Sequence, residues 1–166
     1  MPIEPILVNY AADKLAMYCG RIETCVDKLT PEQIWMRNSD NANAIGNLML
    51  HLSGNVRQWI LHGVGGQADL RQRDTEFAAR GGLATAELKE RLRSTVDEAC
   101  CVIRALPPER FTELRTIQKS EVTLIEAILH VVEHFSGHAA QIIFITKLLT
   151  GEDLGFYAYL SKPGAV

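Results

Sequence analysis

The chain has 166 residues, of which 47% are hydrophobic and 22% are charged. At roughly 150 residues per domain, this length predicts a single domain over residues 1–166 with enough apolar side chains to bury a core, which excludes disorder as the main state. Lys and Arg number 17 against 20 Asp and Glu, and this net charge of −3 disfavours nucleic-acid binding because no basic surplus exists to neutralise phosphates.

The sequence does not predict a membrane protein. A transmembrane helix needs about 20 apolar residues in a row, and Glu126, His130 and Lys147 interrupt the longest hydrophobic stretch. The opening MPIEPILVNY lacks the positively charged segment of a secretory signal. The four cysteines form no CxxC pair, which is typical of reduced thiols in a cytosolic core. We therefore expect a cytoplasmic protein that binds neither membranes nor nucleic acids.

Apolar residues recur at helical spacing in four long segments, and no segment reads clearly as a strand. The expected long helices cover residues 5–29, 43–61, 85–106 and 121–149, and a short helix over 32–35 follows Thr30 as its N-cap. Four helices of about 20 residues, each about 30 Å long, match a four-helix bundle. The predicted fold class is all-α.

A polar stretch over residues 67–82 joins the second and third long helices. It carries Arg71, Asp74 and Glu76, and it is longer than a minimal connection between helices. Two interpretations are open. The segment from Arg71 to Glu76 contacts an anionic substrate near the end of the bundle, or it is an ordinary solvated loop.

Three of the five histidines lie on the fourth helix at steps of four residues: His130, His134 and His138. Residues four apart lie one turn apart on the same face, so two imidazoles can reach one metal ion. All three cannot, because His130 and His138 are about 12 Å apart along the axis. The direction of the apolar side chains favours the pair His134 and His138, with Gln141 on the same face, since His130 points most nearly to solvent.

A third ligand is expected from the second helix, where His51 lies on a polar edge with Asn47, Asn55 and Gln58. His62 borders a glycine-rich turn and is interpreted as a surface residue. A single histidine on a helix edge is usually only solvated, but a pair on one helix and a third on another favour a metal site. Neutral imidazole suits zinc, nickel, copper or iron.

Other chemistries fit the pattern less well. The stretch from His130 to His134 reads HVVEH and matches the motif of inverted zinc proteases, but only Glu152 remains downstream to complete such a site. Glu-x-x-His pairs on two helices, which a di-iron bundle needs, are absent. No phosphate-binding glycine loop follows a strand.

At these residues the sequence resembles the DinB/YfiT-like family of metalloenzymes. The likeness covers most of the chain and is strongest in residues 47–55 (NLMLHLSGN), 71–77 (RQRDTEF) and 129–147 (LHVVEHFSGHAAQIIFITK). The resemblance implies a four-helix bundle of up-down-down-up topology, often a homodimer. It also implies a divalent metal held by one histidine of the second helix and an HxxxH pair of the last one, which are His51, His134 and His138 here. The chain departs from the family at Ala139 and Ala140, where many members have Arg-Gly.

The resemblance implies chemistry in broad terms. Characterised relatives include thiol-dependent S-transferases and a mycothiol-dependent maleylpyruvate isomerase. We expect a metal-dependent enzyme, with zinc or nickel, that acts on a small molecule by transfer of a low-molecular-weight thiol or by hydrolysis. Asn55 and Gln141 are expected to contact the substrate or the metal-binding histidines. The alternative is a non-catalytic dimeric stress or interaction protein whose metal site is structural or vestigial.

Overall fold

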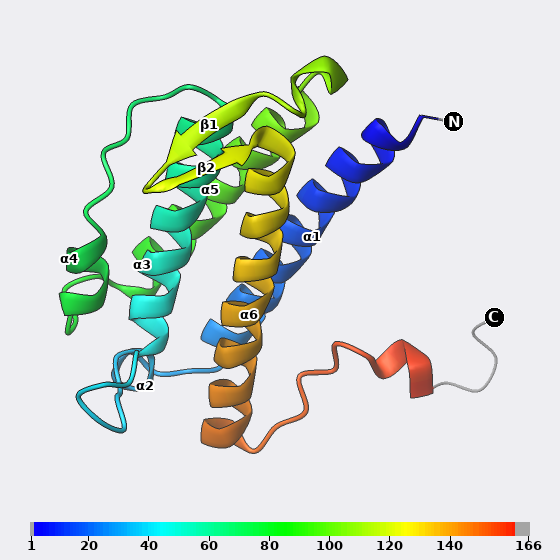
Figure 1. Cartoon of the computed structure of the whole chain (residues 1–166). Helices are drawn as coiled ribbons and strands as arrows, with labels where there is room; N and C mark the ends of the chain where they lie inside the picture. Colours follow the sequence, from blue (N-terminus) through cyan, green and yellow to red (C-terminus); the bar gives the residue numbers. More distant parts are fainter. Residues whose placement is uncertain (1, 162–166) are drawn as a thin grey trace.

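The structure is a computed structural model that describes residues 2–161. Most of it is helical (Figure 1), and the elements follow in chain order. The α-helices are α1 (Ile3–Val26), α2 (Pro31–Ile34), α3 (Ile45–Val56), α4 (Arg73–Ala78), α5 (Thr85–Arg104) and α6 (Leu124–Thr150). The other elements are the π-helix η1 (Arg57–Val64), the 3₁₀ turns η2 (Pro108–Arg110) and η3 (Ala158–Ser161), and the strands β1 (Leu114–Ile117) and β2 (Ser120–Thr123).

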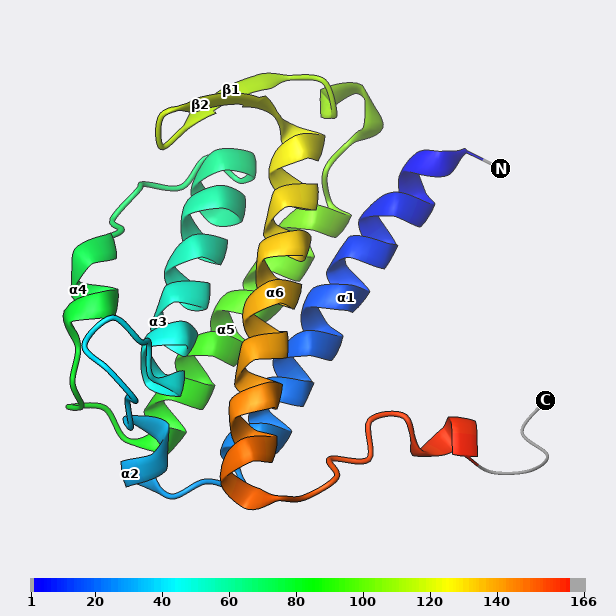
Figure 2. The ribbon, with the colours of Figure 1, turned by 60° about the horizontal axis from the view of Figure 1, so that its bottom comes forward.

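Four long helices surround one hydrophobic core. Helix α1 packs against α5 and α6, and α3 packs against the same two helices from the other side. In Figure 2, α3 lies beside α5 and α6, and α1 lies across the bundle from it. The largest side chains in the core include Leu15, Leu52, Leu92 and Phe135, one from each long helix, and all are fully buried. The prediction of a mainly helical protein is confirmed.

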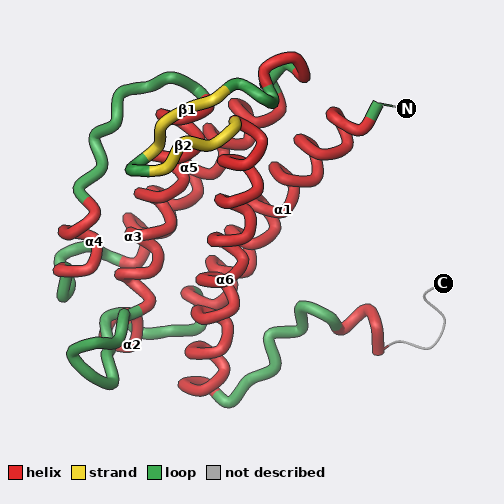
Figure 3. The backbone as a smooth tube through the Cα atoms, viewed as in Figure 1, coloured by secondary structure: helices red, strands yellow, loops and turns green. Residues whose placement is uncertain are grey.

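No segment of the sequence reads clearly as a strand, but the structure contains two short ones. Strands β1 and β2 form an antiparallel hairpin between α5 and α6, with Leu114 opposite Thr123 and Ile117 opposite Ser120 (Figure 3). Each strand has only four residues, too few for the alternation that identifies a strand. The turn lacks an Asn-Gly pair, and Gln118 itself takes the left-handed conformation with φ 58°.

The second long helix also differs from its prediction, because it does not end near residue 61. Helix α3 gives way to the wider π-helical turns of η1, which continue to Val64. A side chain at Gly63 would collide with Ile117 of β1, which is 1% exposed. Glycine at this position therefore lets the hairpin pack closely over η1.

Helix α6 carries two of the three candidate ligands, His134 and His138. It is long and apolar enough to cross a membrane by length and composition, a test that the core helix of a soluble protein also passes. Its residues Ile128, Val131, Phe135 and Ile142 are fully buried against the other helices.

Hydrogen bonds at the first turns fix where two helices begin. The Thr30 hydroxyl accepts from the Gln33 amide and the Gln33 side chain accepts from the Thr30 amide, so Thr30 caps α2 as predicted. Thr123 and Glu126 form the same reciprocal pair at the start of α6.

Replacement of Thr123 by alanine should lower the free energy of unfolding by about 1 kcal/mol, because the first turn of α6 loses its cap. Urea denaturation measures this. Thr24→Ala is the control, since Thr24 lies exposed inside α1 and alanine has the higher helix propensity there. The capping role is contradicted if both variants are as stable as the parent protein.

Candidate metal centre

Three imidazoles meet between α3 and α6. His51 lies in the middle of α3, and His134 and His138 lie one turn apart on α6. One nitrogen from each ring lies within 4.8 Å of the others. His51 Nε2 and His134 Nε2 are 3.1 Å apart, and His51 is only 5% exposed. This cluster, called the histidine triad below, could hold a metal ion.

A buried carboxylate sets the protonation of His51. Glu76 Oε2 lies 3.0 Å from His51 Nδ1, and an ionised carboxylate can only accept a hydrogen bond. Nδ1 therefore carries the proton, and the lone pair of His51 is at Nε2, on the side that faces the other two rings. A carboxylate behind a histidine in this way is typical of metal ligands.

Arg71 balances the charge of that carboxylate. Its Nε and Nη2 donate to the two oxygens of Glu76, each at 2.8 Å, and both side chains are more than nine-tenths buried. Burial by itself would raise the pKa of Glu76, but the hydrogen bonds from Arg71 and His51 and the charge of Arg71 hold it below its ordinary value. Arg71 Nη2 also lies 3.1 Å from His51 Nδ1. Because both nitrogens are donors there, they share Glu76 Oε2 as acceptor.

The helix that carries Glu76 is held in place by side chains from elsewhere in the chain. The Asn47 amide donates to the carbonyl oxygens of Glu76 and Ala79, at 2.8 and 2.9 Å. Arg37 donates to Asn47 Oδ1 at 2.6 Å and to the Phe77 carbonyl at 2.9 Å. Helix α4, which has only six residues, is thereby fastened to α3.

Gly54 lets the carboxylate approach α3. It lies one turn after His51, and a Cβ atom there would overlap Glu76 Oε1 and lie 3.1 Å from Arg71 Nε. Any side chain at this position would therefore push Glu76 away from His51.

The other two imidazoles are also suited to bind a metal. Gln141 Oε1 lies 2.8 Å from His138 Nδ1, so His138 donates there and keeps its lone pair at Nε2. Burial, with added effects of His138 and His51, lowers the pKa of His134 to about 3. His134 Nδ1 is buried, and no group in the described part of the chain hydrogen bonds to it. Three imidazole rings, two of them with the lone pair at Nε2, fit a divalent ion such as zinc.

His130 is placed differently from the sequence prediction. It stands outside the triad as expected, but it does not face solvent: it is half-buried, and its ring centre lies 4.1 Å from that of Trp59. Burial lowers its pKa. The difference arises because η1 and the hairpin pack against α6 near His130, which a mean direction of apolar side chains along the helix does not take into account. His62, predicted as a surface residue, is half-buried, with Nδ1 2.6 Å from the Gln67 carbonyl oxygen.

The polar stretch before α5 turns out to belong to this site. The prediction of a substrate contact or a solvated loop missed the buried pair of Arg71 and Glu76 behind His51. Gln141 accepts a hydrogen bond from His138, a member of the triad. Asn55 is 3% exposed and makes no side-chain hydrogen bond within residues 2–161, so it does not orient a histidine.

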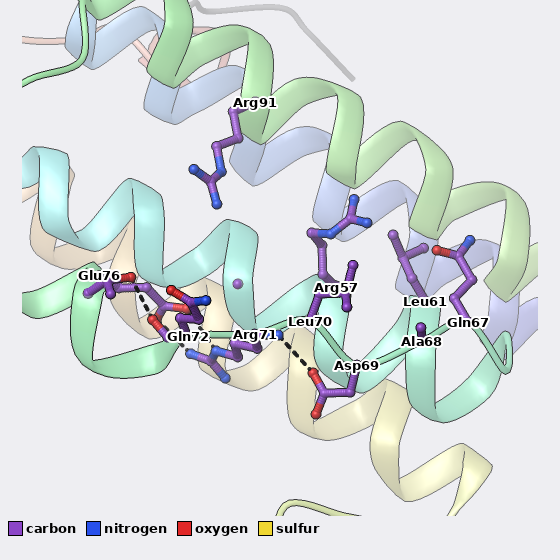
Figure 4. Close-up of a pocket in the computed structure, with 12 residues that line it drawn as sticks. Arg57, Leu61, Gln67, Ala68, Asp69, Leu70, Arg71, Gln72, Glu76 and Arg91 are labelled. Carbon is purple, nitrogen blue, oxygen red and sulfur yellow. Dashed lines mark hydrogen bonds and ion pairs between the residues drawn. The ribbon is translucent and has the colours of Figure 1, made fainter.

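Two pockets flank the pair of Arg71 and Glu76. The loop pocket, about 400 Å³, lies between residues 67–72, Arg57 of η1 and Arg91 of α5 (Figure 4). The hairpin pocket, about 500 Å³, is bordered by His51 and His134 and roofed by the β-hairpin. Only the hairpin pocket is lined by members of the triad, so a small molecule there would lie directly beside it.

Replacement of Gly54 by alanine should destabilise the protein by at least about 1 kcal/mol and weaken metal binding, because the new methyl group displaces Glu76. Helix propensity alone predicts a gain of about 0.5–1 kcal/mol for the same change. Gly137→Ala is the matched control: Gly137 lies between the two α6 ligands, with open space around its Cβ position. Equal gains in stability for both variants, measured by urea denaturation, would exclude this role of Gly54.

Comparison with known proteins gives a family but no characterised relative. No curated protein matches the sequence. The model of an uncharacterised family, described as "Protein of unknown function (DUF1572)", matches residues 6–163, which is nearly the whole chain. The chain therefore belongs to the DUF1572 family.

Proposed function

We propose that this protein is a metal-dependent enzyme of the DinB/YfiT-like type that acts on a small molecule, by transfer of a low-molecular-weight thiol or by hydrolysis. The observation that carries the proposal is the histidine triad beside a pocket: His51, His134 and His138 present nitrogens within 4.8 Å of one another. These three residues would hold one divalent ion, with zinc or nickel favoured by the imidazole ligands.

Three protein ligands are typical of catalytic metal sites, because a structural site usually has four. A divalent ion in such a site lowers the pKa of a bound thiol or water and so supplies a nucleophile at neutral pH. The chain's own residues orient the ligands: Glu76 keeps the proton of His51 at Nδ1, and Gln141 accepts from His138 Nδ1.

The chain's own cysteines are poor candidates for the nucleophile. Cys19, Cys25 and Cys100 are buried, and burial raises the pKa of each, that of Cys19 to about 12. Cys101 is exposed on α5, which packs on α1 and α3 rather than beside the α6 ligands. A thiol in the reaction would therefore come from a separate small molecule.

The arrangement of the long helices supports the DinB/YfiT-like part of the proposal. In Figure 1, α3 and α5 run upward and α1 and α6 run downward, as in an up-down-down-up bundle. The long connection between α3 and α5, which contains α4, allows these two helices to run in the same direction.

Replacement of His51, His134 or His138 by alanine should each weaken zinc binding at least about 10-fold, since the loss of even an indirect contact costs 10–100-fold. His130→Ala is the matched control and should bind zinc like the parent protein. Isothermal titration measures the four affinities. If His130→Ala abolishes binding and His138→Ala does not, the site uses the other pair on α6.

The enzymatic part is tested on the same variants. Purified protein with its metal is screened for the consumption of a thiol with an electrophile and for hydrolysis of ester and amide substrates. Activity should be lost in the three ligand variants and kept in His130→Ala. If metal binding raises the melting temperature by many degrees and no reaction is found, the alternative of a non-catalytic protein with a structural metal gains support.

The proposal includes a cytoplasmic homodimer, as in the bundles that the sequence resembles. The exposed aromatic residues Tyr157 and Tyr159 offer apolar surface to a partner. Light scattering at micromolar concentration should give about twice the 18.4 kDa of the chain. A mass equal to that of one chain would rule the dimer out.

A further inference from the structure

The hairpin pocket contains buried polar groups that have no partner. Four buried side-chain atoms in the described part of the chain make no hydrogen bond, and three of them belong to residues that line this pocket: Asn55 Oδ1, Trp59 Nε1 and His134 Nδ1. The loop pocket is lined by none of them. Asn55 is 3% and Trp59 6% exposed.

A buried donor or acceptor without a partner is costly, so proteins seldom keep two side by side without use. Asn55 and Trp59 lie four residues apart, where α3 passes into η1. Together they supply one acceptor and one donor on the wall that meets the triad. A polar molecule in the pocket can satisfy both groups.

One of the two arginines that line the pocket has no anionic partner among residues 2–161. Arg71 is paired with Glu76, and the carboxylate of Glu126 accepts from the amide and hydroxyl of Thr123. Arg73 forms no ion pair with any residue from 2 to 161, so its guanidinium is the cation of the lining that remains to bind an anion, although the lining also carries the charge of Glu126.

The position of Arg73 relates this charge to the triad. Its guanidinium lies 4.8 Å from the centre of the Phe77 ring, and that ring lies 4.7 Å from the ring of His51. Arg73 is thus separated from the triad by a single aromatic side chain. Trp59 and His130 also line the pocket, with ring centres 4.1 Å apart, and their faces suit a flat or apolar body.

We propose that the hairpin pocket is the substrate site and binds a small organic acid. Arg73 holds the carboxylate, the body of the acid lies against Trp59, and its polar substituent hydrogen bonds to Asn55. The volume of about 500 Å³ is in the range for small-molecule sites. The inference rests on the proposed function only in taking the triad as the reacting centre.

Benzoate is a suitable probe, and benzamide has the same shape without the charge. The chain has two tryptophans, so in a Trp35→Phe background the fluorescence reports Trp59 alone. Titration with benzoate should change the fluorescence of Trp59 until the pocket is saturated, and benzamide should bind at least about 10-fold more weakly. Arg73→Gln is expected to weaken benzoate binding at least about 10-fold, as the loss of a charged hydrogen bond predicts.

Arg57→Gln is the matched control, because Arg57 lines the loop pocket and not the hairpin pocket. It should leave benzoate binding unchanged. The proposal is overturned if benzoate gives no saturable change, if benzamide binds equally well, or if Arg57→Gln weakens binding and Arg73→Gln does not.

His138→Ala separates this proposal from the proposed function, since His138 does not line the pocket. The variant should lose zinc and still bind benzoate, which supports an anion site formed by the chain itself. Loss of both would mean that the ion holds the anion, and the proposal falls. If neither the parent protein nor any variant binds zinc but benzoate binding depends on Arg73, the proposed metal-dependent function is wrong and the anion site is supported.

Discussion

The carboxylate of Glu76 is the group on which the site depends. It is buried, accepts hydrogen bonds from Nε and Nη2 of Arg71 and from Nδ1 of His51, and packs against the bare backbone of Gly54. A charge in such surroundings is stable only while its partners remain, because the cost of removing it from water is large. Helix α4, α3 and the imidazole of His51 are therefore positioned by one network, in which a change to one member disturbs the rest.

Local patterns in the sequence were sufficient for much of the fold. The apolar spacing located the long helices, and Thr30 marked the start of α2. The hairpin was missed because its strands are four residues long and its turn uses Gln118, which carries no turn signature. The change from α3 to the π-helix η1 was missed as well. It is accompanied by the close packing of Ile117, from strand β1, on Gly63, and this contact between distant residues has no signal in the sequence.

In the candidate site, the three histidines were predictable from the sequence, but the groups that orient them were not. The spacing of His134 and His138 on one helix brings them to one face, and a polar edge on α3 singled out His51. The contact between Glu76 and His51 could not be predicted, because the two residues are 25 positions apart and the loop that joins them has no periodic pattern. His130 was predicted to face solvent, because the apolar side chains of α6 point mostly the other way. Its ring instead packs on Trp59, which comes from a different helix and leaves no periodic signal in α6.

The β-hairpin that covers the pocket has little stability of its own. Two strands of four residues have little stability in isolation, so this one depends on Ile117 against Gly63 and on the bond from Gln118 to Gln58, 2.8 Å long. Such elements open locally at a lower free energy than the core that carries them. The entry of molecules to the histidines can therefore depend on the hairpin more than on the stability of the bundle. Substitutions in the exposed residues 118–121 are expected to change the rate of entry while the melting temperature stays nearly the same.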